Sequence, residues 1–174
     1  KLCKHDEDLA KLKDLPAVTK DGRTIALRCN LDLQEELAMT IKNGAQGIGL
    51  VRTEQLFEGL ESFPDEDEQA EVYESIAEKI YPEKVIIRAF DIGGDKVLPV
   101  DVKEPNPFLG WRGVRFLLDN IELFKSQTRA ILRASVHKNL KYMIPMIMSV
   151  EEVRKVKILL NECKEELTNE GVNF

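Results

Sequence analysis

Short apolar segments alternate along the chain with longer stretches of mixed character. The apolar segments cover residues 24–30, 47–51, 85–87 and 142–147. Runs of this length are typical of buried strands. After each one, apolar residues recur every three or four positions, which predicts an amphipathic helix. The pattern therefore predicts four successive strand–helix units.

Capping and breaking signals set the expected bounds of the first two helices. Asp32 and Glu35 have the spacing of a capping box, and Asn43-Gly44 ends the helix that they open. Ser62 and Pro64 open the second helix, whose first turn is acidic. The expected apolar positions are Leu33, Leu37 and Ile41 in the first helix and Val72, Ile76 and Ile80 in the second.

The last two helices carry similar signals. Helical patterning starts again at Gly113, with a break expected at Asp119-Asn120. Ser149 and Glu152 form a capping box that opens a long helix, and Gly171 ends it. Both helices follow short apolar strands, so the alternation continues to the end of the sequence.

Alternating strands and helices predict a parallel sheet of the α/β class, with strands buried on both faces. Two architectures fit: a four-stranded open sheet, or four of the eight units of a (β/α)₈ barrel. Half a barrel would leave two unpaired strand edges, which natural domains avoid. The barrel reading therefore implies a truncated chain.

The first residues differ from the rest. Residues 1–15 place leucines among charges, as an amphipathic helix does, and Pro16 closes the segment. We expect residues 1–20 to form a helical linker arm and residues 21–174 to form the sheet domain.

Composition narrows the possible functions. The chain has 174 residues, 43% of them hydrophobic, and a net charge of −6, which argues against a diffuse nucleic-acid-binding surface. No apolar run approaches the roughly 18 residues of a membrane span, so we expect a cytoplasmic protein without membrane insertion. Three cysteines without a CxxC pair, and only two histidines, predict neither a disulfide framework nor a zinc site.

Cationic residues follow two of the predicted strands. Arg52 and Arg88 fall at strand ends, and Lys96 and Arg112 follow the third strand. Working groups of parallel α/β folds lie at the carboxyl ends of strands, so we expect these four residues to meet at one edge. Such a cluster suits a small ligand with several negative charges, such as a phosphorylated carboxylate.

The alternative is that these arginines pair with nearby acids, namely Glu54, Asp91 and Asp95. The sequence also lacks a set of acid, base and nucleophile sufficient for turnover. His5 and His137 are expected to be surface histidines, and Cys29 a buried, inert thiol.

Several motifs together resemble one family. They are GIGLVRTE at 47–54, FPDEDEQ at 63–69, VIIRAFDIGGDK at 85–96, NPFLGWRGVR at 106–115, LRAS at 132–135 and MIPMIMSVEEVR at 143–154. In this order they resemble enzyme I of the bacterial sugar phosphotransferase system, the phosphoenolpyruvate-protein phosphotransferases. The resemblance runs from about Leu12 to Phe174 and covers the first half, about four βα units, of that family's C-terminal phosphoenolpyruvate-binding TIM barrel, a (β/α)₈ fold.

The resemblance implies residue roles. Arg52 and Arg88 would bind the phosphate and carboxylate of phosphoenolpyruvate, and Lys96 and Arg112 would line the same pocket. It implies no catalytic residue and no metal ligand within this chain, because the family's Mg²⁺-binding Glu and Asp, a further substrate arginine and a cysteine thought to protonate the enolate lie beyond Phe174.

The resemblance also implies a reaction and partners. In the family, phosphoenolpyruvate with Mg²⁺ phosphorylates a histidine on a separate N-terminal domain. That domain passes the phosphoryl group to a histidine-containing phosphocarrier protein for sugar uptake, and the full-length enzyme is expected to be a homodimer. Neither histidine of this sequence matches the phosphohistidine motif, so this chain alone is expected to be inactive.

Two other readings remain. Pyruvate phosphate dikinase and phosphoenolpyruvate synthase share the RTE motif and the barrel, although GGDK and NPFLGWR favour enzyme I. The chain is alternatively a non-catalytic anion-binding domain that keeps the arginines and has lost the chemistry.

Overall fold

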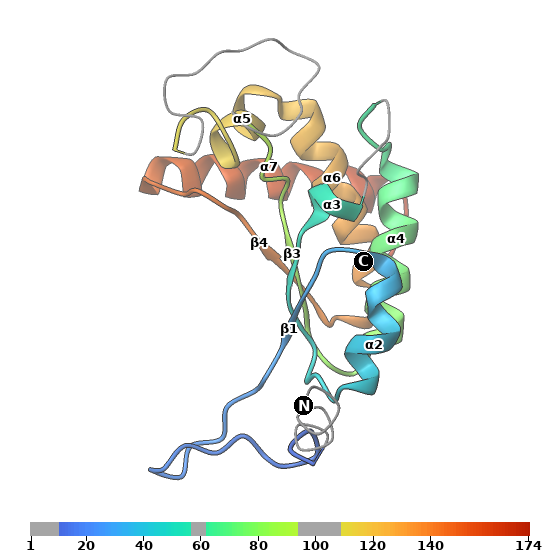
Figure 1. The fold of residues 1–174 in the computed structure, drawn as a ribbon. Helices are drawn as coiled ribbons and strands as arrows, with labels where there is room; N and C mark the ends of the chain where they lie inside the picture. The colour runs from blue at the N-terminus through green and yellow to red at the C-terminus, as the bar shows by residue number, and fades with distance from the viewer. Residues whose placement is uncertain (1–10, 57–61, 94–108) are drawn as a thin grey trace.

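The chain folds around one parallel β-sheet. The structure, a computed structural model, describes residues 11–56, 62–93 and 109–174 (Figure 1). The strands are β1 (Cys29–Leu31), β2 (Ile48–Val51), β3 (Val85–Arg88) and β4 (Leu140–Met143), and all neighbouring pairs are parallel. The predicted α/β class is therefore confirmed.

The sheet order separates the two predicted architectures. The strands lie in the order β1-β2-β3-β4, so each strand pairs with the next one in the sequence. A doubly wound sheet reverses direction at a switch point, whereas successive barrel units do not. The described strands therefore have the topology of consecutive units of a (β/α)₈ barrel.

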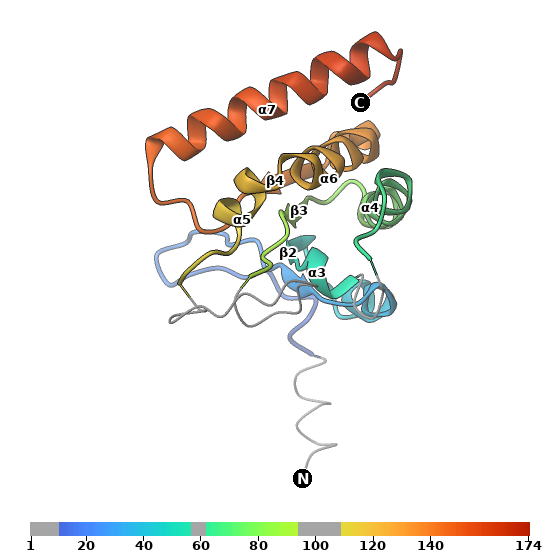
Figure 2. The same cartoon turned by 90° about the horizontal axis from the view of Figure 1, so that it is seen from above.

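Helices connect the strands and lie in an arc around them (Figure 2). The connection from β1 to β2 contains η1 (Gln34–Glu36) and α2 (Leu37–Lys42), and the next contains α3 (Thr53–Leu56) and α4 (Glu66–Ile80). The connection from β3 to β4 contains α5 (Val114–Asp119), α6 (Ile121–Arg133) and η2 (Ala134–His137). The last helix is α7 (Val150–Asn169). None of these described helices is long and apolar enough to cross a membrane.

Two apolar clusters hold the sheet and the helices together. Ile48, Val51 and Ile87 of the sheet pack with Tyr73 and Ile76 of α4, all without exposed surface. A second cluster lies beyond the end of β3 and joins the segment after that strand to α5, α6 and α7; its members include Phe90, Leu117, Phe124 and Val156. The carboxyl end of β3 therefore lies between the two clusters.

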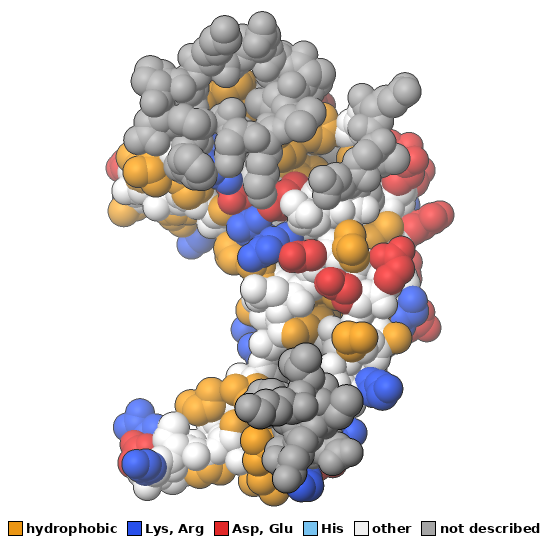
Figure 3. Space-filling view, in the orientation of Figure 1, with side chains coloured by type: hydrophobic (Ala, Val, Ile, Leu, Met, Phe, Trp, Pro, Cys, Tyr) orange, Lys and Arg blue, Asp and Glu red, His pale blue; other side chains and the backbone are white. Residues whose placement is uncertain are grey.

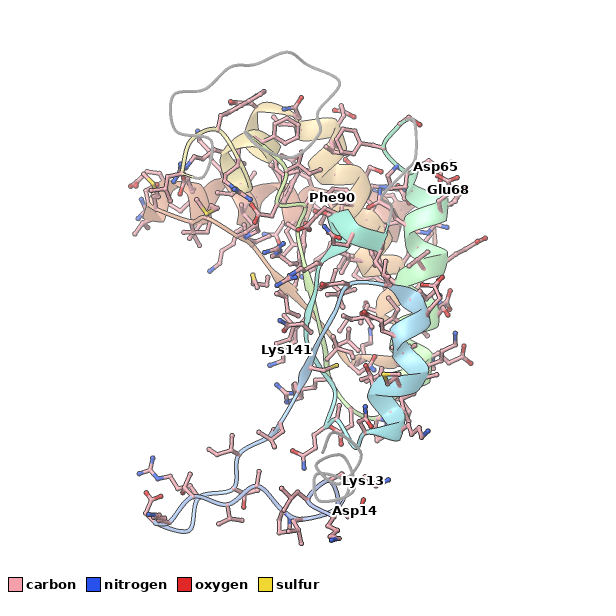
Figure 4. All side chains as sticks on the ribbon, viewed as in Figure 1. Lys13, Asp14, Asp65, Glu68, Phe90 and Lys141 are labelled. Carbon is pink, nitrogen blue, oxygen red and sulfur yellow. The ribbon has the colours of Figure 1, made fainter. Side chains whose placement is uncertain are left out.

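The predicted start of α7 is confirmed, whereas that of α4 is wrong. Ser149 and Glu152 form the predicted capping box of α7. The chain also breaks between α5 and α6 at Asn120, as predicted. Helix α4 starts later than predicted. Asp65 is its N-cap and forms a capping box with Glu68 (Figure 4).

The first predicted strand is wrong in its bounds. It covers Cys29–Leu31, not 24–30, and Ile25 and Leu27 are exposed rather than buried. The strand is shorter because β1 pairs with β2 only from Cys29 onward. Thr24 instead forms an antiparallel bridge with Val18.

The first predicted capping box is also wrong. The carboxylate of Glu36, not Glu35, accepts hydrogen bonds from the backbone N–H groups of Asp32 and Leu33. The Asp32 side chain turns to Arg52 instead. Of the predicted apolar face only Leu37 is buried, because α2 is a single short helix at the rim of the layer; Leu33 and Ile41 are exposed.

The last strand is shifted relative to the prediction. It covers Leu140–Met143 rather than 142–147, since Pro145 has no N–H to donate to a neighbouring strand and Met146 has a positive φ. Lys141 of β4 points away from the helices and is exposed (Figure 4), and Asn30 of β1 is exposed too. The expectation of strands buried on both faces is therefore wrong for β4 and β1.

The predicted linker arm is only partly described. Residues 11–15 form turns and residues 11–20 contain no helix, while residues 1–10 lie outside the described part of the chain. The division into residues 1–20 and 21–174 stays a prediction.

Ion pairs join the outer helices α4, α6 and α7. Arg129 of α6 contacts Glu66 of α4 at 2.6 Å, Glu166 of α7 at 3.3 Å and Glu170, directly after α7, at 2.7 Å. Only 15% of the Arg129 side chain is exposed. The nearby ammonium of Lys125 donates to Glu166 and lowers the pKa of that carboxyl. Arg129 thus connects three helices, of which α4 and α6 share the first apolar cluster and α6 and α7 share the second.

We expect Arg129→Met to lower the free energy of unfolding by about 1–2 kcal/mol, because the apolar stem stays while three carboxylates lose a shared, mostly buried partner. Urea denaturation measures the change. The matched control is Arg154→Met on α7, whose partner Glu151 is as exposed as Arg154 itself; we expect a change below about 0.5 kcal/mol. An equal loss of unfolding free energy in both variants would show that Arg129 does not stabilise the contact between the three helices.

Candidate functional site

Three charged residues lie side by side at the carboxyl edge of the sheet. Leu31 pairs with Val51 in the register of β1 and β2, and Val51 pairs with Ile87 in that of β2 and β3. The residues that directly follow these three are Asp32, Arg52 and Arg88. The structure therefore brings Arg52 and Arg88 to one level on adjacent strands.

Arg52 is the more accessible of the two arginines. Its Nη1 donates to the Asp32 carboxylate at 2.9 Å, and 40% of its side chain and 37% of that of Asp32 are exposed. Figure 3 shows basic and acidic side chains next to one another in the middle of the concave face. A ligand arriving from solvent can therefore reach the donors of Arg52.

Arg88 and Arg112 belong to a mostly buried chain of ion pairs. Arg88 contacts Glu54 through Nη2 and Asp91 through Nη1, the latter at 3.4 Å. The other oxygen of Asp91 accepts from Nε of Arg112 at 3.1 Å. The Asp91 carboxylate thus holds the two guanidinium groups next to each other.

This geometry fulfils part of the alternative reading, since Glu54 and Asp91 pair with site arginines as that reading predicts. Lys96 and Asp95 lie outside the described residues, so their places in the site stay predictions. Pairing within the described part of the chain does not exhaust the donors: a guanidinium has five N–H groups, and the buried Nε of Arg88 has no hydrogen-bond partner among the described residues. Donors therefore remain for an anionic ligand.

A loop contact places Arg112. Gly93 and Arg112 form an antiparallel bridge, and a Cβ on Gly93 would collide with the Trp111 carbonyl and the Arg112 side chain. Indole Nε1 of Trp111 donates to Asp119 at 2.7 Å. Arg115 donates to the Gly110 carbonyl at 2.7 Å. Because Gly93 has no side chain, its backbone can approach that of Arg112. The hydrogen bonds of Trp111 and Arg115 hold the segment around Arg112 in place.

A buried polar network behind the arginines was missed by the sequence reasoning. Its side chains, none of them exposed, are Thr53, Gln69, Tyr73 and Gln127. Burial raises the pKa of Tyr73 well above its usual range, so its hydroxyl stays protonated. A signal was present, because Gln127 lies on the same helical face as Phe124 and Ile131, where apolar residues are expected.

Other candidate chemistry is limited in the described part of the chain. His137 is exposed, as expected, and His5 lies outside that part. Cys29 is half-buried, not buried as expected. Burial raises the pKa of the Cys163 thiol to about 11. The described residues contain no group of three or more His, Cys, Asp or Glu side chains placed to hold a metal ion.

The fold and the site define a class: an α/β domain that presents paired arginines at the carboxyl edge of a parallel sheet. Residues 6–174 match the family model described as the PEP-utilising enzyme, PEP-binding domain. The chain belongs to this family of phosphoenolpyruvate-binding domains.

Curated relatives share the match. The chain is 45% identical to a phosphoenolpyruvate-protein phosphotransferase of Staphylococcus carnosus over 97% of its own length and 30% of the relative. It is 46% identical to the Haemophilus influenzae protein of that name over 100% of this chain and 31% of the relative. It is 43% identical to the Bacillus subtilis protein over 93% of this chain and 29% of the relative. The chain thus spans about three-tenths of the length of these relatives.

We expect Gly93→Ala to destabilise the protein and displace the loop that carries Arg112. The control is Gly22→Ala: both glycines have a positive φ, but nothing lies within 4 Å of a Cβ on Gly22. Gly22→Ala should cost about 1 kcal/mol of unfolding free energy, from backbone strain alone. Gly93→Ala should cost at least about 1 kcal/mol more, from the collision.

Urea denaturation compares the two costs. Fluorescence of Trp111, the only tryptophan in the sequence, should shift in the folded Gly93→Ala variant and stay unchanged in Gly22→Ala. Equal losses of unfolding free energy and equal fluorescence spectra in the two variants would show that the position of Arg112 does not depend on the close approach at Gly93.

Proposed function

We propose that this chain binds phosphoenolpyruvate through Arg52 and Arg88, with Arg112 and Lys96 lining the same pocket. The observation that carries the proposal is the strand register, which puts Arg52 and Arg88 directly after paired residues of β2 and β3. Membership in the phosphoenolpyruvate-binding family supports it.

The chemistry of the ligand suits two arginines. Phosphoenolpyruvate carries a phosphate and a carboxylate, and a guanidinium forms two parallel hydrogen bonds with either group. Neighbouring strands lie about 4.8 Å apart, so side chains that follow paired residues can contact two anionic groups of one small molecule. Arg52 offers exposed donors, and Arg88 is held in place by Glu54 and Asp91.

The acids of the site balance its charge. Among the described residues, the three arginines meet three carboxylates, those of Asp32, Glu54 and Asp91. The charges of these six side chains cancel, so directed hydrogen bonds from prepositioned guanidinium groups, rather than the net charge of this set, would hold the ligand. Since Asp32 pairs with the exposed Arg52, the ligand has to compete with this carboxylate.

At the level of the whole protein, we propose a phosphoenolpyruvate-protein phosphotransferase, the name that the relatives carry. It would transfer the phosphoryl group to a histidine of the enzyme and on to a histidine-containing phosphocarrier protein for sugar uptake. A homodimeric, cytoplasmic protein belongs to the same proposal. The relatives' name favours this reading over a dikinase or a synthase.

Magnesium belongs to the proposal as the ion that neutralises charge on the transferring phosphoryl group. The described residues do not fit an ion site of their own, because they bring no three ligand side chains together. We therefore assign no step through a metal to this chain. Its residues bind and orient the ligand.

We expect Arg88→Lys to weaken phosphoenolpyruvate binding about tenfold or more. Lysine keeps the charge but cannot form two parallel hydrogen bonds, each worth about 1.5–3 kcal/mol, and 1.4 kcal/mol is a factor of ten. Isothermal titration calorimetry on the full protein encoded by the gene measures the dissociation constant. The control is Arg23→Lys, an exposed arginine paired with Asp21, which should leave the constant unchanged.

An unchanged affinity in Arg88→Lys would rule out Arg88 as a ligand of the substrate. Absence of phosphoenolpyruvate binding by the unaltered protein, with inorganic phosphate still bound, would favour a non-catalytic anion-binding domain.

We expect Asp32→Asn to tighten phosphoenolpyruvate binding about two- to fivefold. Removing the charge frees Arg52 from a half-exposed ion pair, and such pairs are worth up to about 1 kcal/mol. The same titration measures the change, with Asp21→Asn as the matched control because Asp21 pairs with Arg23 instead. Weaker binding in Asp32→Asn would mean that Asp32 orients Arg52 rather than competing for it.

A further inference from the structure

One carboxamide lies behind both site arginines. Gln127 of α6 is fully buried, and its Oε1 accepts a hydrogen bond from the backbone N–H of Phe90 at 2.9 Å. Its Nε2 donates to Thr53 Oγ1 at 3.1 Å and to the Tyr73 hydroxyl at 3.2 Å. Figure 4 labels Phe90 just past the end of β3. Gln127 therefore joins the segment after β2 to the segment after β3.

Thr53 extends this connection to Arg88. Its hydroxyl donates to the backbone carbonyl of Arg88 at 2.9 Å. Thr53 directly follows Arg52 and precedes Glu54, whose carboxylate pairs with the Arg88 guanidinium. The start of α3 therefore contacts both the backbone carbonyl and the guanidinium of Arg88. Gln127 donates to the Thr53 hydroxyl that makes the first of these contacts.

Burial makes this arrangement specific. A buried polar group without a partner costs about 1–3 kcal/mol, so a carboxamide whose acceptor and both donor positions are occupied is held in one place. A displacement of Gln127 would take this acceptor from the Phe90 N–H and this donor from the Thr53 hydroxyl. The two backbone segments therefore cannot move independently at low cost.

We propose that Gln127 is a positioning residue that sets the placement of Arg52 relative to Arg88, and thereby the affinity for a ligand with two anionic groups. This inference rests on the proposed function of the site. Gln127 lies one layer behind the arginines and acts through backbone atoms. A ligand with a single anionic group needs only one arginine, so its affinity should depend on Gln127 much less.

The chain offers a matched control for Gln127. Gln69 of α4 is equally buried and belongs to the same network. It accepts from the Tyr73 hydroxyl at 3.2 Å and donates to the Pro64 carbonyl at 3.0 Å and to Ser126. These contacts lie on the helix side of the network. Replacing Gln69 therefore removes a buried carboxamide without touching Thr53 or Phe90.

The test compares Gln127→Met with Gln69→Met in the full protein encoded by the gene. Both variants should lose unfolding free energy in urea to a similar degree. The dissociation constant for phosphoenolpyruvate should rise about tenfold or more in Gln127→Met, because small misplacements of binding groups are costly, and less than about twofold in Gln69→Met. Binding of inorganic phosphate should change less than about threefold in both.

A milder pair keeps the test decisive if Gln127→Met folds poorly. Thr53→Val removes the hydroxyl that links Gln127 to Arg88, and Thr128→Val removes a buried hydroxyl that contacts Tyr142 at 3.4 Å instead. Only Thr53→Val should weaken phosphoenolpyruvate binding. Where Gln127→Met folds, combining it with Thr53→Val should add little further loss of affinity, because the two residues act as one link.

Crystal structures of the two glutamine variants provide a readout independent of the ligand. The guanidinium groups of Arg52 and Arg88 should be displaced relative to each other in Gln127→Met and unchanged in Gln69→Met. Unchanged positions, or equal losses of phosphoenolpyruvate affinity in both variants, would overturn the inference. Failure of the unaltered protein to bind phosphoenolpyruvate would overturn the proposed function instead, while the displacement would still decide the role of Gln127.

Discussion

The register between β2 and β3 is the constraint on which the site depends. Pairing of Val51 with Ile87 fixes the level at which both strands end, so Arg52 and Arg88 leave the sheet side by side. A slip of one residue would turn one of these side chains to the opposite face. The buried apolar residues of β2, β3 and α4 form one cluster that holds this register, because a slip would turn buried apolar side chains to the opposite face.

Polar contacts add precision that apolar packing cannot supply. Apolar burial is non-directional, whereas hydrogen bonds from Gln127 and Thr53 specify where individual backbone atoms lie. Carboxylates then orient the guanidinium groups, with the mostly buried Glu54 and Asp91 on one arginine and the half-exposed Asp32 on the other. The site thus combines one fixed and one accessible arginine.

Two of the failed predictions share a physical cause. Residues 24–28 have the composition of a strand, yet they extend past the start of β2 and find no partner in the sheet. Asp32 has the spacing of a helix cap, yet Arg52 lies close enough to take its carboxylate. In both cases a neighbour distant in sequence decided the outcome, and local patterns carry no information about such neighbours.

The sequence by itself determined the alternation of strands and helices, the parallel class, the capping of α7 and the arginines that follow two strands, because periodicity and caps are local properties. Its motifs also carried the family resemblance. Only the tertiary structure decided which acid pairs with which arginine and that Gln127 of α6 reaches Thr53 and Phe90. Those contacts join residues from different strand–helix units, and their distances depend on how the units pack.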